Sequence, residues 1–189
     1  MNITYKRNFL IYGIFFSFIS LFPESKSKEN WKLDMKQSSI QFYVKAKVEN
    51  VKGTFDLVEL KEFEEKENIE SLKGNLIVNI DSINTKSKKR DNHLRSKDFF
   101  EVEKFPNAII TVKEIRKIDS EYNANITLEI KNKKKDYLIP IEIIKEKSQI
   151  KAIGKFQVNR SDFGINGNAL TNIIVDNNVD LSFAIVIVK

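Results

Sequence analysis

The chain has 189 residues, of which 41% are hydrophobic and 31% charged, and its formal net charge is +6 at pH 7. This composition is too apolar for a disordered chain and too charged for a protein with several membrane spans, and the length predicts one domain. The absence of cysteine excludes disulfides and thiolate chemistry, and the single histidine, His93, excludes a site built from two histidines.

The first 27 residues are interpreted as a leader that is not part of the fold. Lys6 and Arg7 precede the uncharged run 9–22, and the small residues Ser25 and Ser27 follow it. This is the layout of a secretory signal peptide. The uncharged run of 14 residues is short for a membrane-spanning helix, which needs about 20 apolar residues. An uncleaved N-terminal anchor stays open as the alternative. We therefore expect an exported protein, periplasmic or secreted, with one domain at residues 28–189.

Most of the remaining chain alternates between apolar and polar residues, which is typical of strands with one buried face. The clearest runs are 40–48, 76–81, 124–131, 137–143, 150–158 and 179–187, and the weaker candidates are 53–60 and 108–117. About eight strands joined by short polar turns predict an antiparallel barrel or sandwich. Lys133, Lys134 and Lys135 fall between two runs and are interpreted as a solvated hairpin tip.

Residues 85–102 break the alternation and contain neither glycine nor proline. Asn84 or Thr85 can cap a short helix there, Ser96 can cap a second turn, and Pro106 ends the segment. The segment and its end carry large apolar residues, namely Leu94, Phe99, Phe100 and Phe105. We expect this insertion to cover one end of a barrel or the gap between two sheets.

The character of the interior stays open at this point. An eight-stranded sheet that closes on itself is either just filled by side chains or holds one small ligand. Apolar alternation is more often simply core.

Several separated motifs occur in order along the chain. They are WKLD at 31–34, VKGTF at 51–55, DSINT at 81–85, RDNHLRS at 90–96, DFFEVEKFP at 98–106, NITL at 125–128 and NRSDFGI at 159–165. Together they resemble the signature of the YceI-like family, which comprises exported polyisoprenoid- or lipid-binding proteins. Gln37 and Ala46 stand where that family commonly has histidine.

The resemblance implies an all-β fold, namely an extended eight-stranded antiparallel β-barrel, lipocalin-like in outline, with a short helical insertion between strands. It also implies a long isoprenoid or similar lipid along the barrel interior. The residues expected to line this apolar tunnel are Phe42, Val44, Val78, Ile80, Leu94, Phe99, Phe100, Phe105, Ile126, Leu128, Phe156, Val158, Phe163, Leu181 and Phe183.

Four charged residues are expected at the head group or the mouth of the tunnel: Arg90, Asp91, Arg160 and Asp162. Arginine–aspartate pairs of this kind hold loops together through forked hydrogen bonds, and their guanidinium groups also suit a polar or phosphorylated lipid head. Both interpretations stay open. His93 is interpreted as a hydrogen-bonded structural residue.

We expect no enzyme, no catalytic residue, no metal and no cofactor besides the bound lipid, because the chain lacks a second histidine and a Gly-x-Ser-x-Gly elbow. The predicted function is an exported carrier or scavenger, with a stress-related role left open. Its ligand would be a polyisoprenoid, an isoprenoid quinone or a similar long-chain amphiphile. The alternative is a secreted structural or adhesion barrel with a filled interior. No nucleic-acid partner is expected, whereas transient membrane contact and a homodimer stay open.

Overall fold

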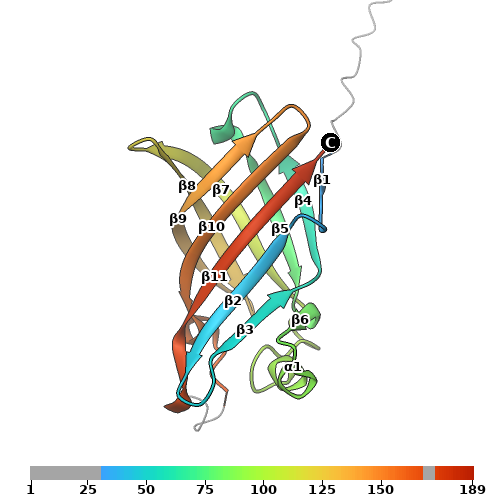
Figure 1. Cartoon of the computed structure of the whole chain (residues 1–189), viewed down its shortest axis with the longest axis vertical. Coiled ribbons are helices and arrows are strands. Elements are labelled where there is room, and N and C mark those ends of the chain that lie inside the picture. Colours follow the sequence, from blue (N-terminus) through green and yellow to red (C-terminus); the bar gives the residue numbers. More distant parts are fainter. Residues whose placement is uncertain (1–30, 168–172) are drawn as a thin grey trace, which may run out of the picture.

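The computed structural model describes residues 31–167 and 173–189 (Figure 1), so the predicted signal peptide at 1–27 lies outside the described residues. Within these ranges, eleven strands form one antiparallel sheet that curls into an elongated barrel. The strands are β1 (Lys32–Leu33), β2 (Ser39–Ala46), β3 (Val51–Phe55), β4 (Val58–Glu64), β5 (Lys73–Asn79), β6 (Ile83–Asn84), β7 (Asn107–Ile118), β8 (Glu121–Ile130), β9 (Lys133–Lys145), β10 (Gln149–Asn159) and β11 (Val175–Val188). The connections carry the helix α1 (Lys88–Arg95) and the short 3-10 helices η1 (Ile69–Ser71), η2 (Ile80–Ser82) and η3 (Arg160–Phe163).

Three positions around the barrel are each filled by two short strands. β1 and β2 lie end to end beside β11, with which both of them pair. A bend at Asp56 and Leu57 separates β3 from β4, and η2 separates β5 from β6. Joining each of these pairs reduces the eleven described strands to eight positions. The prediction of an eight-stranded antiparallel barrel with a helical insertion is therefore confirmed.

The junction between the positions β1/β2 and β3/β4 is paired in the lower half of the barrel and unpaired in the upper half. In the lower half, β2 pairs with β3 over Ile40–Val44. β6 pairs with β3 and forms no described ladder with β7. In the upper half, the described residues form no backbone ladder between β4 and either β1 or β2. The rings of Trp31 and Phe63 meet there instead, edge to face, with 5.9 Å between their centroids. We call this upper junction the seam.

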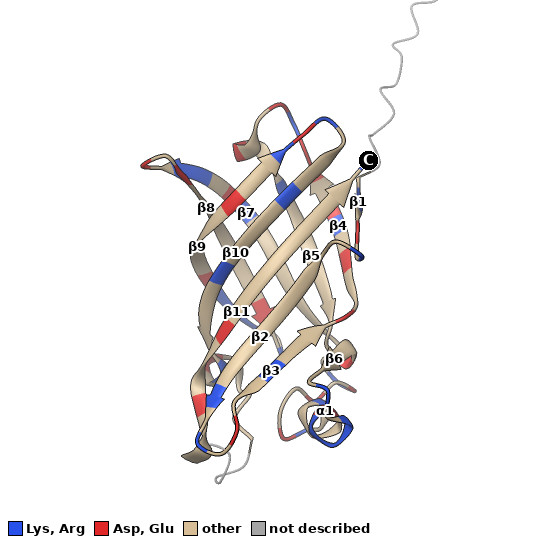
Figure 2. Ribbon diagram, in the orientation of Figure 1, with Lys and Arg blue, Asp and Glu red and all other residues tan. Residues whose placement is uncertain are grey.

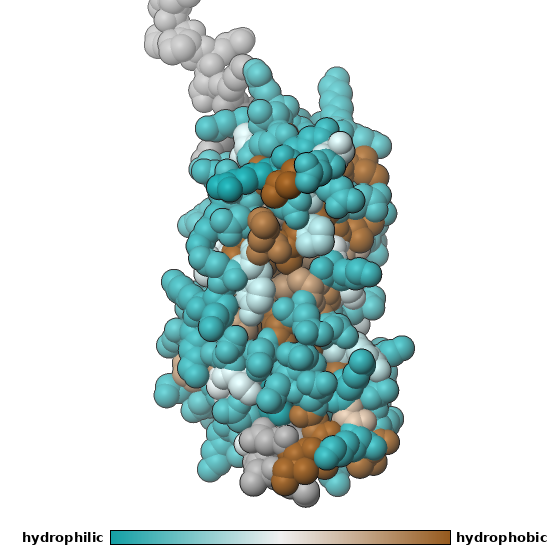
Figure 3. Space-filling model, turned by 90° about the vertical axis from the view of Figure 1, so that its left-hand side faces the viewer, coloured by the Kyte–Doolittle hydropathy of each residue, from teal (hydrophilic) through white to brown (hydrophobic). Residues whose placement is uncertain are grey.

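The strand alternation places apolar side chains inside the barrel and polar ones outside. In β8, Ala124, Ile126 and Leu128 are buried, and the residues between them are less so. Figure 2 shows the charged residues spread over the outer strands and the loops, and Figure 3 shows a mostly hydrophilic surface on one face. Because burying one large aliphatic side chain contributes about 1.5–3 kcal/mol, the interior residues hold the barrel closed.

The helical insertion is present, but its cap differs from the prediction. α1 begins after Ser87, whose hydroxyl accepts the Arg90 N–H at 3.4 Å, so neither Asn84 nor Thr85 is the cap. The Thr85 side chain is buried and engaged elsewhere, as described below. Ser96 ends α1 as its C-cap. No helix in the described ranges is long and apolar enough to cross a membrane.

Two details of the strand prediction need correction. The β8–β9 hairpin turns at Lys131 and Asn132, which both have positive φ, at 50° and 59°. Positive φ at both central residues suits the two-residue turn that matches strand twist. The three lysines at 133–135 therefore begin β9 and are exposed on it rather than forming the tip. The run 53–60 is broken into two strands by the bend at Asp56 and Leu57.

Candidate functional site

Two apolar cavities lie inside the described part of the barrel and meet near its middle. The cavity beside α1, here called the lower chamber, has a volume of ≈ 490 Å³. The cavity beside the β4–β5 connection, here called the upper chamber, has a volume of ≈ 140 Å³. Four aliphatic residues line both chambers, namely Ile40, Ile110, Leu128 and Leu181. The two cavities therefore adjoin inside the barrel, and these four side chains form their common wall.

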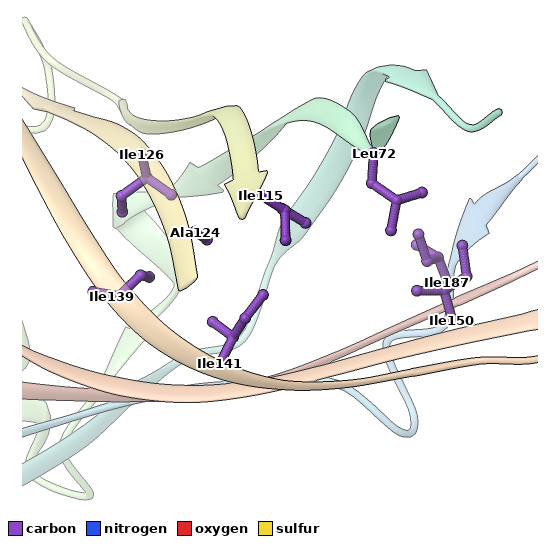
Figure 4. Packing of buried hydrophobic residues seen from close by; sticks show 8 residues of the cluster. All are labelled: Leu72, Ile115, Ala124, Ile126, Ile139, Ile141, Ile150 and Ile187. Carbon is purple, nitrogen blue, oxygen red and sulfur yellow. The ribbon is translucent and has the colours of Figure 1, made fainter. Parts of the chain in front are cut away.

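The upper chamber has an entirely apolar surface. Figure 4 shows part of its wall, where aliphatic side chains from β7, β8, β9, β10 and β11 converge with Leu72 of the β4–β5 connection. The eight residues shown are Leu72, Ile115, Ala124, Ile126, Ile139, Ile141, Ile150 and Ile187. Such a surface offers a ligand no polar contact, so it suits a hydrocarbon chain.

Most of the residues predicted for the tunnel line one of the chambers. Those in the lower chamber are Phe42, Val44, Val78, Ile80, Leu94, Phe99, Phe100, Leu128, Val158, Phe163 and Leu181. Those in the upper chamber are Ile126, Phe156 and Phe183, with Leu128 and Leu181 shared. Phe105 lines neither chamber. The ammonium groups of Lys104 and Lys131 lie 5.1 and 5.7 Å from the centre of its ring.

Sequence reasoning missed other lining residues. Ile139, Ile141 and Ile150 occupy the apolar positions of alternating runs, so the alternation alone could have placed them inside the barrel. Phe63 and Leu72 lie in residues 61–72, where no alternation of apolar and polar residues predicted a strand or helix. Their place in the wall of the upper chamber follows from the tertiary structure.

Two glycines leave room for aromatic rings in the wall. Gly53 pairs with Phe42 across β3 and β2, and Gly154 pairs with Phe183 across β10 and β11. A Cβ atom at Gly154 would lie only 2.5 Å from the Phe183 ring, and one at Gly53 would overlap the Phe42 ring. Each ring therefore lies over a glycine, where a side chain would push it inward.

The lower chamber has charged and imidazole groups in its wall, namely Arg90, His93 and Arg160. Arg90 donates from Nε to the Thr85 hydroxyl and from a terminal nitrogen to the Thr85 carbonyl, both at 3.0 Å. The buried Asp91 carboxylate accepts the Thr85 N–H at 2.8 Å and the Thr85 O–H at 2.6 Å. Asp91 thus does not line the chamber; it fixes Thr85, and Thr85 fixes the direction of Arg90.

Arg160 is 5% exposed and ties the η3 loop to the start of β11. Its guanidinium donates to the backbone carbonyls of Ile165 (2.7 Å), Asn166 (2.8 Å), Asp176 (3.0 Å) and Val175 (3.2 Å). Burial lowers the pKa of the Arg160 guanidinium from its ordinary value, and the nearby Asp176 charge opposes this shift. Asp162 lies outside the chamber, with its carboxylate 3.5 Å from the Lys135 ammonium.

His93 lies at the opening of the lower chamber, with half of its side chain exposed. Its Nε2 is 3.6 Å from an Asp98 carboxylate oxygen, and its ring meets the Phe99 ring edge to face at 4.9 Å. These contacts orient the imidazole beside the opening. Among the described residues, no group of three or more acidic or histidine side chains could hold a metal ion.

The fold and the cavity define a β-barrel of the class that can enclose one small ligand. A family model described as the YceI-like domain matches residues 31–187, and the chain belongs to this family. The resemblance inferred from the motifs is therefore confirmed.

Curated relatives include the UPF0312 proteins of Staphylococcus aureus. The SAS2572 protein of strain MSSA476 is 28% identical over 145 residues, which cover 74% of this chain and 84% of the relative. The SAR2769 protein of strain MRSA252 is 29% identical over the same length.

Solved structures share the fold. BcnA of Burkholderia cenocepacia superposes with a TM-score of 0.73 at 19% identity, covering 82% of this chain and 98% of BcnA. A polyisoprenoid binding domain from Saccharophagus degradans gives 0.68 at 15% identity, with 84% and 98% covered. The YceI protein of Campylobacter jejuni gives 0.62 at 27% identity, with 74% and 85% covered.

Proposed function

We propose that this protein binds a polyisoprenoid, an isoprenoid quinone or a similar long-chain amphiphile, as a carrier or scavenger outside the cytoplasm. The apolar chain would occupy both chambers, and the polar head would lie at the lower chamber beside Arg90, His93 and Arg160. The observation that carries this proposal is the pair of adjoining apolar cavities inside the barrel. The export signal interpreted at residues 1–27 supports a site of action outside the cytoplasm.

The size of the lower chamber favours a bound ligand over the alternative of a filled structural barrel. An apolar cavity of about 150 Å³ already stays dry and binds benzene. The lower chamber, at ≈ 490 Å³, is well above that size. A structural barrel would gain stability from larger side chains at this place, because unfilled volume costs packing energy.

Burial would supply the affinity. Each Å² of apolar ligand surface removed from water contributes about 25 cal/mol, which is opposed by the cost of ordering a flexible chain. Such an interior selects ligands by length and thickness and discriminates weakly between similar tails. This mode of binding needs no chemical step, so we propose a binding protein rather than an enzyme. The polyisoprenoid binding domain of S. degradans, which has the same fold, supports the ligand class.

The geometry around Arg90 supports a place for the head group. The Nε and one terminal nitrogen of Arg90 donate hydrogen bonds to Thr85. The other terminal nitrogen lies 3.7 Å from a carboxylate oxygen of Glu49, whose side chain is exposed. An anionic or carbonyl-bearing head could replace Glu49 at this nitrogen without disturbing the bonds to Thr85. Arg160, by contrast, binds backbone carbonyls, so its main contribution is to hold the chamber wall.

The test is native mass spectrometry of protein purified without detergent from an exporting host, followed by organic extraction. We expect one prenyl lipid or quinone for each protein molecule. Val51→Trp, which fills the lower chamber from β3, should abolish the adduct. Its matched control is Lys52→Trp, the next residue on β3, which is exposed and does not line the chamber. A wild-type protein that carries no lipid and takes up no offered prenyl lipid or quinone would overturn the proposal.

A further inference from the structure

The lower end of the barrel exposes apolar side chains beside the chamber opening. Val48, in the β2–β3 turn, is 86% exposed, and Ile173, just before β11, is 63% exposed. The two lie close together, because the Lys47 N–H donates to the Ile174 carbonyl at 2.9 Å. Figure 3 also shows hydrophobic atoms at the lower end of the molecule. We call this end, formed by the β2–β3 turn, α1 and residues 173–174, the lower rim.

Basic side chains outnumber acidic ones in the elements beside these apolar residues, although the exposed Glu49 and Asp176 also lie there. In residues 86–97 the acidic residue is Asp91, which is buried, and the basic residues are Lys86, Lys88, Lys89, Arg90, Arg95 and Lys97. Figure 2 shows this concentration of basic residues at α1. The β2–β3 turn joins the same surface, since Glu49 lies 3.7 Å from Arg90. The end of β2 adds Lys45, and the turn adds Lys47.

One segment at the opposite end of the barrel is acidic. Residues 62–70, at the end of β4 and the start of the β4–β5 connection, contain Lys66 and five acidic residues, namely Glu62, Glu64, Glu65, Glu67 and Glu70. An anionic surface would therefore attract the lower rim and repel this connection, which orients the long axis of the barrel.

Resting on the proposed function, we propose that the lower rim docks on an anionic phospholipid membrane, with Val48 and Ile173 inserted at the level of the head groups. Exposed apolar residues beside a predominantly basic helix fit such a surface, since each lysine near it adds attraction and each apolar side chain leaves water. A purely polyanionic partner would use the lysines but not the apolar residues. In this orientation the chamber opening beside Arg90 and His93 faces the bilayer, so a lipid tail can pass between membrane and barrel while its head stays at the interface.

The test measures binding to vesicles made of equal parts of phosphatidylglycerol and phosphatidylcholine, without prenyl lipid, using protein purified after export from a bacterial host. Replacing two exposed lysines, Lys88→Gln with Lys89→Gln, should weaken partitioning about 25-fold, at about fivefold for each lysine. Val48→Ser should weaken it about tenfold, because valine no longer leaves water. Binding should also fall as salt is raised and on vesicles of phosphatidylcholine alone.

Matched controls come from other parts of the surface. Lys36→Gln with Lys147→Gln removes two exposed lysines at the upper end, and Leu138→Ser removes an aliphatic side chain that is 58% exposed on β9. Both should bind vesicles as wild type does. Equal loss in these controls, or binding that depends on the lysines but is unchanged by Val48→Ser, would overturn the docking proposal.

A separate measurement keeps docking and lipid binding distinguishable. Uptake of a prenyl quinone delivered from ethanol, without vesicles, is followed by native mass spectrometry. Uptake without vesicle binding would overturn docking alone. Vesicle binding without uptake would overturn the proposed function, and with it the transfer of lipid through the lower opening.

Discussion

At the scale of single residues, the volume available to a ligand depends on two glycines. Phe42 and Phe183 lie over Gly53 and Gly154 on the neighbouring strands, where any Cβ atom would overlap the ring. Pairing an aromatic ring with a cross-strand glycine also covers the backbone that glycine leaves bare. A methyl group at either glycine would therefore displace the ring and reduce the volume of the cavity.

We expect Gly154→Ala to push Phe183 into the upper chamber and to shorten the longest lipid that the protein retains. Overpacking of this kind costs about 1–3 kcal/mol of folding stability. The measurement is the chain length of lipids extracted after loading with a series of prenyl quinones. Phe183→Ala in the same chain removes the displaced ring, so the double variant should again retain the long lipids. An unchanged length distribution in Gly154→Ala would contradict this account.

At the scale of elements, the bend between β3 and β4 is held by one carboxylate. Asp56 accepts the Thr54 hydroxyl at 2.6 Å and the Asn84 side-chain amide at 3.0 Å, so it joins β3 to β6 where the sheet closes. The hydrogen bond from Thr54, followed by that from Asn84, lowers the pKa of the Asp56 carboxyl from its ordinary value of 3.8. The charged form is thus favoured in the folded state.

This lowered pKa predicts a dependence of stability on pH. The contribution of Asp56 is fully present above the ordinary carboxyl pKa and is lost as the pH falls through the lower pKa of the folded state. Wild type should therefore be more stable than Asp56→Asn at pH 6, and the difference should shrink as the pH falls below about 4. Urea unfolding across this range measures it. A difference that stays constant down to pH 2 would contradict the assignment.

The elements that could be predicted from the sequence are those that depend on neighbouring residues in the chain rather than on tertiary contacts. Alternation in residues 124–131 and 150–158 is local, and it gave both the strands and inward residues such as Leu128. The helix cap could not be chosen from sequence, because Thr85 is a good cap residue until Asp91 and Arg90 engage it. Phe105 follows an irregular turn, where no period fixes the direction of a side chain.

At the scale of the whole molecule, the upper end is held by a loop contact as well as by strands. The Lys145 ammonium of β9 lies 2.5 Å from a Glu65 carboxylate oxygen and donates to the carbonyls of Lys66 and Glu67 at 2.9 and 3.1 Å. Both side chains of the ion pair are mostly buried. This contact holds the β4–β5 connection over the upper chamber.

We expect Lys145→Met to release this connection, with a loss of about 1–3 kcal/mol because Glu65 is left without its partner. Backbone amides of residues 65–72 should exchange hydrogen faster, and hydrogen-exchange mass spectrometry measures this. Lys147→Met, two residues further on and exposed, is the control. Exchange in 65–72 that matches wild type would contradict the role given to Lys145. Adding Glu65→Leu should recover much of the lost stability, because no unpaired charge then stays buried.

The seam affects how far the circumference of the barrel can change. Below the seam, β2 pairs with β3, so parting these two strands would break backbone hydrogen bonds. In the upper half, side chains such as Trp31 and Phe63 bridge the ends of the sheet, so the circumference there can grow by parting these side chains alone. The upper chamber, at ≈ 140 Å³ the smaller of the two, therefore lies beside a junction that can part without loss of strand pairing. Parting the seam would enlarge this chamber around a thick ligand.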